Sequence, residues 1–157
     1  MGRLDNLNIV FGYDSLHSRS IHSLSKLLAQ YPNNNFTFTG PESLLPNKAM
    51  INELESLGVT CKIESELSSL NGYDVVYVNR LQEERFEDKT LFEKHRRKFR
   101  LERDFVENSN ALILDPLPRI DEISTDVDSL PNAVYFKQAS YGVPVRMALL
   151  AMMLGKA

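Results

Sequence analysis

Three arginines, Arg19, Arg80 and Arg119, each lie in a segment that follows a short apolar run. A guanidinium group binds a carboxylate or a phosphate through two parallel hydrogen bonds. Arg19 also lies near the start of a predicted helix, where the helix dipole favours an anion. If the three segments meet in the fold, the sequence predicts a site for a small ligand that carries two negative charges.

The segment 115–128 places two prolines directly after the last of these apolar runs. Pro116 and Pro118 have no backbone N–H and stiffen the chain, so the nearby carbonyl oxygens keep fixed directions. A neutral amine would donate hydrogen bonds to such carbonyls. The acids of this segment lack the Asp-x-Asp-x-Asp-Gly order and the closing glutamate of a calcium loop. The residues alone therefore indicate a binder of a small anionic amine, and they leave an enzymatic role open.

Other residues with chemical potential have simpler explanations. His17 and His22 are five residues apart, so they do not share a helical face, and we expect loop or capping roles for both. Cys61 is expected to be a buried strand residue without a base to activate it. Arg85 is expected to pair with Glu84 or another acid rather than with a ligand. We expect no metal site and no cofactor.

Short apolar runs alternate along the chain with segments of helical periodicity. We expect strands at residues 8–11, 36–39, 59–63, 74–78 and 111–114. We expect helices at residues 18–30, 46–57, 66–70 and 141–154. This order predicts an α/β fold: a three-layer, doubly wound, Rossmann-like parallel sheet of about five strands with helices on both faces. Ligands bind such sheets beyond the carboxyl ends of the strands, where the three arginines are expected.

Two segments depart from this regular pattern. Residues 83–107 carry many charges of both signs, and we expect a solvated helix there, with a mobile lid over the site as the alternative. The helix at 141–154 is apolar almost all round, which is typical of a buried helix. If the chain offers no cover for it, the helix must find a partner or expose a patch that drives association.

The composition is that of one globular domain covering residues 1–157, with 43% hydrophobic and 25% charged residues. The net charge of −3 argues against nucleic-acid binding. The single cysteine, Cys61, excludes an internal disulfide framework, so we expect a reducing, cytoplasmic location. The start of the chain lacks the apolar core of a signal peptide, and no apolar stretch is long enough to cross a membrane.

Several longer motifs resemble the aspartate carbamoyltransferase family. The motifs are GRLDNL (2–7), DSLHSRSIHSL (14–24), YVNRLQEERF (77–86), PLPRIDEISTDVD (116–128) and AVYFKQASYGVPVRMALLAMMLG (133–155). The resemblance covers essentially the whole chain, but only the C-terminal, L-aspartate-binding half of the family enzyme. The Ser-Thr-Arg-Thr motif of the carbamoyl-phosphate-binding domain is absent, so we expect that domain to be missing from this chain.

The resemblance assigns roles to five residues. It implies that Arg19 holds the α-carboxylate of L-aspartate and that Arg80 holds the side-chain carboxylate. It implies that Gln82 helps to orient the substrate, and that the backbone carbonyls of Pro116 and Leu117 face the reacting amine. No catalytic residue is expected within this chain alone.

The resemblance also implies a reaction and a set of partners. L-Aspartate would attack carbamoyl phosphate to give N-carbamoyl-L-aspartate and phosphate, a step of pyrimidine biosynthesis. The chain would be inactive alone. It would need a carbamoyl-phosphate-binding domain from another chain, or a full-length carbamoyltransferase chain, within a homo- or hetero-oligomer.

Two positions depart from the family pattern. Asp115 stands where the family usually has histidine, and Glu83 stands where a basic residue is common. An acid beside a dicarboxylate site should repel the ligand unless the acid is paired or points away. The alternative function is therefore a degenerate, non-catalytic subunit that assembles with a full-length enzyme. A third possibility is a carbamoyltransferase with a different amine substrate.

Overall fold

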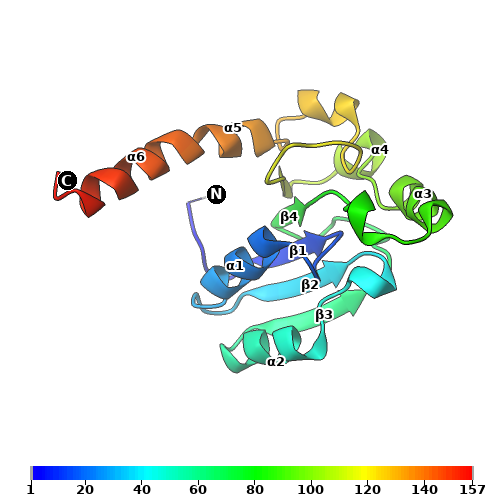
Figure 1. Ribbon diagram of the computed structural model, residues 1–157, viewed down its shortest axis with the longest axis horizontal. Coiled ribbons are helices and arrows are strands. Elements are labelled where there is room, and N and C mark those ends of the chain that lie inside the picture. Colours follow the sequence, from blue (N-terminus) through cyan, green and yellow to red (C-terminus); the bar gives the residue numbers. More distant parts are fainter. Residues whose placement is uncertain (1, 157) are drawn as a thin grey trace.

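The computed structural model describes residues 2–156 and contains one five-stranded sheet in the order β3-β2-β1-β4-β5 (Figure 1). The strands are β1 (Asn8–Gly12), β2 (Asn35–Thr39), β3 (Thr60–Glu64), β4 (Val75–Val78) and β5 (Leu112–Leu114). Each pair of neighbouring strands runs parallel. The predicted α/β fold is confirmed. Because β1 lies between β2 and β4, the chain changes direction across the sheet at the β1–β4 boundary.

The helices are α1 (Arg19–Leu28), α2 (Lys48–Ser56), α3 (Lys89–Lys98), α4 (Arg103–Val106), α5 (Tyr135–Ser140) and α6 (Gly142–Met153). Short 3₁₀ turns lie at η1 (Glu42–Leu44), η2 (Glu83–Arg85) and η3 (Thr125–Ser129). Side chains cap the starts of three helices. Ser18 Oγ accepts from Ile21 N–H at 3.3 Å, Asn47 Oδ1 accepts from Met50 N–H at 2.9 Å, and Asp88 Oδ1 accepts from Thr90 N–H at 2.8 Å.

The helix expected at residues 66–70 is wrong, because this segment is irregular. Ser69 Oγ accepts a hydrogen bond from the Asn71 N–H at 2.9 Å. A serine that binds a neighbouring backbone group in this way favours a turn over a helix. Leu70, at 2% exposure, is drawn into the core at the end of the segment.

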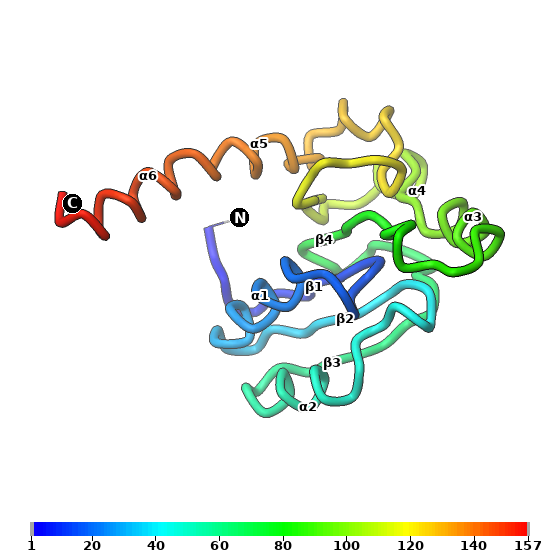
Figure 2. The backbone as a smooth tube through the Cα atoms, viewed as in Figure 1, coloured from blue at the N-terminus to red at the C-terminus, as the bar shows by residue number. Residues whose placement is uncertain are grey.

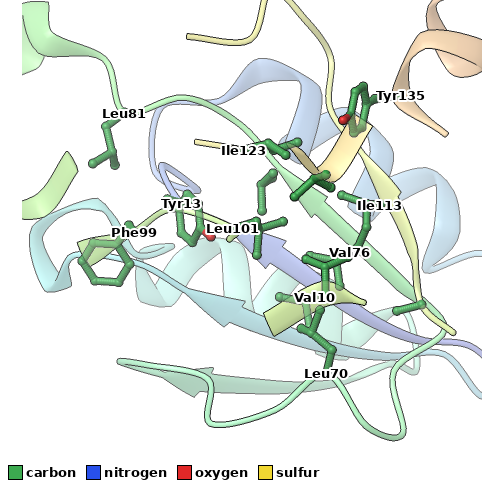
Figure 3. Packing of buried hydrophobic residues seen from close by; sticks show 14 of the residues in the cluster. Val10, Tyr13, Leu70, Val76, Leu81, Phe99, Leu101, Ile113, Ile123 and Tyr135 are labelled. Atoms are coloured by element: carbon green, nitrogen blue, oxygen red, sulfur yellow. The ribbon is translucent and has the colours of Figure 1, made fainter. Parts of the chain in front are cut away.

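The two faces of the sheet carry separate hydrophobic clusters. On β1, Ile9 and Phe11 join the cluster that packs under α1 and α2, whereas Val10 joins the opposite cluster. Figure 3 shows that second cluster, in which Val10 and Val76 of the strands lie with Leu101 and other side chains from the segments beyond β4. Burial on both faces explains why β1 and β4 are nearly continuous apolar runs and why both faces need helices.

The charged segment 83–107 is not solvated throughout, so this part of the sequence prediction needs correction. Phe92, Phe99, Leu101 and Val106 are each at most 7% exposed and belong to the cluster of Figure 3. Charges dominate the sequence of this segment, but a few apolar side chains anchor it to the sheet. A lid role for the segment stays a prediction.

The expected burial of the last helix is wrong within this chain. All its large apolar side chains are more than half exposed: Val143, Val145, Met147, Leu149, Leu150, Met152 and Met153. Figure 2 shows α5 and α6 as an arm that extends from the body of the molecule toward the C-terminus. No part of residues 2–156 covers α6, so its apolar surface remains open. None of the described helices is long and apolar enough to cross a membrane.

Candidate functional site

A cleft of about 530 Å³ lies beyond the carboxyl ends of β1, β4 and β5. All five residues predicted from the sequence line it: Arg19, Arg80, Gln82, Pro116 and Leu117. Three loops bring them together, one after each of these strands, at the point where the order of strands reverses. Open parallel sheets bind ligands at this place because the loops diverge there and leave a crevice.

Arg19 is the first residue of α1 and follows the Ser18 cap. Its side chain is exposed, and the guanidinium has no ion pair among the described residues. The positive end of the helix dipole lies at the same place. Arg19 is therefore positioned to receive a carboxylate of a ligand in the cleft.

Arg80 lies just beyond β4 and is held by Glu84. Its Nη1 and Nη2 atoms donate to the two carboxylate oxygens of Glu84 at 3.2 and 2.8 Å. The hydrogen bond from Arg80 is the main reason that the pKa of Glu84 is lowered. Guanidinium has five N–H donors, so three remain for a ligand. The expected pairing of Arg85 with Glu84 or another acid is wrong, because Glu84 pairs with Arg80 and Arg85 forms no ion pair within residues 2–156.

Gln82 is oriented by Asp14, a residue that the sequence did not single out. Asp14 is fully buried, and its Oδ2 accepts from Gln82 Nε2 at 3.0 Å. Its Oδ1 accepts from the backbone N–H of His17 at 3.0 Å and lies 3.1 Å from His17 Nδ1. With its amide nitrogen engaged by Asp14, Gln82 keeps its amide oxygen available to the cleft. Asp14 thus connects the loop after β1 to the loop after β4.

The turn after β5 is fixed by its own aspartate. Asp115 Oδ1 accepts from the Leu117 N–H at 2.5 Å, and the Asp115 N–H donates to Gln138 Oε1 at 3.1 Å. Leu117 has φ +55°, a left-handed conformation that non-glycine residues adopt only when their surroundings enforce it. The hydrogen bond from the turn to Asp115 supplies part of that enforcement, so the carbonyls of Pro116 and Leu117 have fixed directions.

The concern that Asp115 would repel a dicarboxylate depends on where its carboxyl group lies. Asp115 lines the cleft but is only 1% exposed, and its Oδ1 is bound to Leu117 N–H. Burial raises the pKa of Asp115 to about 7; the Leu117 N–H opposes the shift, and the charge of Glu122 adds to it. Asp115 therefore does not present an exposed carboxylate to the cleft.

Glu122 also lines the cleft, although the sequence did not single it out. Its side chain is buried, with the residue only 4% exposed. Its Oε2 accepts from the backbone N–H groups of Ile120 and Asp121 at 3.0 and 2.9 Å. Asp121 and Glu122 are adjacent acids between two isoleucines, and the sequence gave no signal that Glu122 is the one that becomes buried.

Arg119 does not join the other two arginines, contrary to the expected convergence of three. It forms an ion pair with Asp128 and also donates to the Tyr135 hydroxyl. Its guanidinium carbon lies 5.7 Å from the centre of the Tyr135 ring and 5.8 Å from that of Phe136. Arg119 therefore ties the loop after β5 to the start of α5.

The remaining candidates fit their simpler explanations. His22 Nε2 lies 2.9 Å from the Ser15 carbonyl oxygen, which is a loop contact. Cys61 is half-buried on the edge strand β3, and burial raises the pKa of its thiol to about 11. A thiol with this pKa stays protonated and unreactive near neutral pH. The Glu83 side chain is 59% exposed and lies 3.9 Å from Lys89, so solvent and a cation moderate its charge.

The fold and the cleft define a class of protein: a doubly wound α/β domain with a cleft beyond its strand ends that suits a small charged ligand. The groups that line that cleft include two guanidinium groups, the Gln82 amide and a turn with oriented carbonyls. This set suits a molecule with two carboxylates and an amine.

The family within that class follows from comparison with known proteins. The family model of the aspartate/ornithine carbamoyltransferase Asp/Orn binding domain matches residues 5–153. The chain belongs to this family. It is 44% identical over 156 residues to the aspartate carbamoyltransferase catalytic subunit of Leptospira biflexa, and 40% identical over 151 residues to that of Methanocaldococcus jannaschii.

A solved structure gives the same result for the fold. The catalytic subunit of M. jannaschii aspartate transcarbamoylase superposes with a TM-score of 0.93 at 39% identity. The match covers 99% of this chain and 51% of that one. Likewise, 98% of this chain aligns with 50% of the L. biflexa protein, and 96% aligns with 49% of the M. jannaschii protein. The chain spans about half the length of the curated relatives it matches.

Proposed function

We propose that this chain is the L-aspartate-binding half of an aspartate carbamoyltransferase. The observation that carries the proposal is the meeting of Arg19, Arg80, Gln82 and the Pro116–Leu117 turn in one cleft. Two guanidinium groups from separate loops match the two carboxylates of L-aspartate better than they match a ligand with a single negative charge. The names of the relatives agree with this substrate.

In the proposed complex, Arg19 binds the α-carboxylate and Arg80 binds the side-chain carboxylate, with Gln82 beside it. The carbonyls of Pro116 and Leu117 accept hydrogen bonds from the amine and orient its lone pair. The amine nitrogen bonds to the carbonyl carbon of carbamoyl phosphate, the bond to the phosphate oxygen breaks, and the amine loses a proton. This chain contributes alignment of the attacking group rather than a covalent nucleophile.

The proposal includes a second domain that binds carbamoyl phosphate, with residues 1–157 forming a single amino-acid-binding domain. Support comes from the open apolar surface of α6, where Met147 and Met153 are 64% and 83% exposed. Apolar helices of this kind are stable in water only when another surface covers them. The same proposal implies a cytoplasmic enzyme of pyrimidine biosynthesis that works as a homo- or hetero-oligomer.

The alternative of a non-catalytic subunit loses most of its motivation. It was based on the charges of Asp115 and Glu83. Asp115 is buried and bound to Leu117 N–H, and Glu83 is largely in solvent near Lys89. Neither acid leaves an exposed carboxylate between Arg19 and Arg80.

The test is reconstitution with a separately produced carbamoyl-phosphate-binding domain. We expect N-carbamoyl-L-aspartate from the mixture, none from this chain alone, and none with L-ornithine as the amine. Arg19→Gln and Arg80→Gln should abolish the reaction. Arg103→Gln should leave it intact, because this partly buried arginine of α4 lies outside the cleft and binds Glu107, Asp126 and Ser129. Assembly without turnover, together with no L-aspartate binding, would favour the non-catalytic subunit.

A further inference from the structure

Asp115 and Glu122 are two buried carboxyl residues in the wall of the proposed aspartate cleft, 1% and 4% exposed. Each uses only one oxygen in a hydrogen bond to the backbone: Asp115 Oδ1 binds Leu117 N–H, and Glu122 Oε2 binds two N–H groups. The other oxygens, Asp115 Oδ2 and Glu122 Oε1, are buried, and no donor among the described residues gives them a hydrogen bond.

Two buried carboxylates with unpartnered oxygens are costly when both are ionised, because like charges repel and each oxygen has lost its water. One proton removes both costs. A protonated carboxyl group donates a hydrogen bond, and a carboxylate accepts one. Glu122 interacts with Asp115 through its charge and through a side-chain hydrogen bond, and both effects favour the protonated form of Asp115.

The groups around the pair do not supply a cation that would replace this proton. Arg119 favours ionised Asp115 but forms its ion pair with Asp128. Tyr77 of β4 interacts with Asp115, and the neutral Gln138 of α5 binds its backbone. Arg80 interacts with Glu122 while it is paired with Glu84.

His17 and Arg19 line the same cleft from the loop after β1 and the start of α1. Within the described part of the chain, however, neither Asp115 nor Glu122 forms a salt bridge with them or with any other basic side chain. The proton is therefore the available means of keeping the pair at a single negative charge.

We propose that Asp115 and Glu122 share one proton, and that this proton controls how tightly the cleft binds L-aspartate. The inference rests on the proposed function for its ligand. With the proton present, Asp115 Oδ2 donates to Glu122 Oε1 and the pair carries one negative charge. When the proton leaves for solvent, the pair carries two, and the second charge opposes a ligand that brings two carboxylates.

Asp115 also acts as a positioning residue. Its Oδ1 holds the N–H of Leu117, whose φ is +55°. The bond between Asp115 Oδ2 and Glu122 fixes the carboxyl plane and hence the direction of Oδ1. Loss of the proton therefore loosens the turn whose carbonyls are proposed to orient the amine.

The variants Asp115→Asn and Glu122→Gln separate the effect of the shared proton from the effect of the hydrogen-bond geometry. In Asp115→Asn, the new amide accepts from Leu117 N–H through its oxygen and donates to Glu122 through its nitrogen. In Glu122→Gln, the new amide donates to Asp115 in the same manner. Each variant keeps the hydrogen bonds and the single negative charge without needing a proton. The matched control is Asp126→Asn, which removes an exposed acid from η3 of the same loop.

The first measurement is the carboxyl carbon signal of Asp115, followed by NMR against pH, which needs no ligand. We expect it to titrate near neutral pH in the wild-type chain and at a clearly lower pH in Glu122→Gln. Titration of Asp115 below pH 5 in the wild-type chain would overturn proton sharing whether or not L-aspartate binds.

The second measurement is L-aspartate affinity at pH 6 and pH 8, with the carbamoyl-phosphate-binding domain present. We expect affinity to fall about tenfold in the wild type and in Asp126→Asn, because the binding-competent form falls in proportion to its protonated fraction. It should change less than about twofold in Asp115→Asn and Glu122→Gln, which need no proton. A tenfold fall that persists in both variants would assign the pH dependence to another group, such as His17, and overturn the proposal.

Failure of the proposed function has a different signature. If the wild type binds no L-aspartate at either pH, the proposed ligand is wrong, and with it the control of affinity. A near-neutral titration of Asp115 that moves in Glu122→Gln would still establish the shared proton.

Discussion

The Oδ1 atom of Asp115 accepts a hydrogen bond from the backbone N–H of Leu117 at 2.5 Å. Asp115 lies buried in the wall of the cleft, and this contact helps to hold the turn after β5, in which Leu117 has a left-handed conformation. The acid that gave the strongest reason to doubt ligand binding is thus part of the scaffold of the cleft.

The raised pKa of Asp115 makes stability depend on pH. Its pKa rises from 3.8 to about 7 on folding, mainly because of burial. Between these values the folded chain holds a proton that the unfolded chain releases, so the free energy of unfolding falls as pH rises from about 4 to 7 and then levels off. Asp115→Asn should remove this fall and raise stability at pH 8 by about 1–3 kcal/mol.

Urea denaturation of both proteins at pH 5 and pH 8 measures the effect. Asp126→Asn serves as the control and should follow the wild type. Equal pH slopes for the wild type and Asp115→Asn would show that Asp115 is ionised in the folded chain at both pH values.

Arg80→Lys should weaken L-aspartate binding by about 10- to 100-fold, although it keeps the positive charge. Lysine cannot bind Glu84 through two parallel bonds and a ligand carboxylate at the same time, and a hydrogen bond to a charged group contributes about 1.5–3 kcal/mol. Isothermal titration with the partner domain present gives the affinity. Arg103→Lys is the matched control, and an equal loss there would remove the special role of Arg80.

Asp14→Asn should affect the ligand more than the fold. The amide nitrogen introduced by this substitution can face Gln82 Nε2, two donors in opposition, so Gln82 must rotate its amide or lose the contact. We expect stability to change by less than about 1 kcal/mol and L-aspartate affinity to fall several-fold. Denaturation and titration of the same sample separate the two effects. Unchanged affinity would mean that the orientation of Gln82 does not matter for binding.

Polar substitutions on α6 should leave the isolated chain as stable as before. Met147→Gln combined with Met153→Gln should change the free energy of unfolding by no more than about 0.5 kcal/mol, because both side chains are exposed. Ile113→Ala, at a fully buried position of β5, should cost about 2–5 kcal/mol. The α6 variant should also associate less with the carbamoyl-phosphate-binding domain in sedimentation experiments. A large loss of stability from the α6 pair would show that the helix packs on its own domain.

Much of the fold could be predicted because burial on both faces makes the central strands β1 and β4 nearly continuous apolar runs. The run at 74–78 became β4 (Val75–Val78), and Ser18 marked the start of α1. The prediction of a helix at 66–70 was wrong, because Ser69 binds Asn71 N–H and favours a turn. The predicted burial of α6 was wrong for another reason. The apolar pattern shows that a helix needs to pack against another surface, but it does not show whether this chain provides that surface.

Site residues could be predicted where their position directly after a strand determines that they lie in the cleft. Arg80 follows β4 closely, so the sheet places it in the cleft. The prediction that Arg119 joins the cleft was wrong, because Arg119 binds Asp128 and Tyr135, which lie further along the sequence. Asp14 and Glu122 were missed because the inward turn of an acid depends on partners that only the folded chain brings together.

The most direct test of the central claim is an amide NMR titration of the chain with L-aspartate, carried out with and without the carbamoyl-phosphate-binding domain. The account predicts saturable shifts at the loops after β1, β4 and β5, at Arg19, Arg80 and Leu117, and no such shifts with L-ornithine. Absence of these shifts at high L-aspartate concentration with the partner domain present, or equal shifts with L-ornithine, would contradict it.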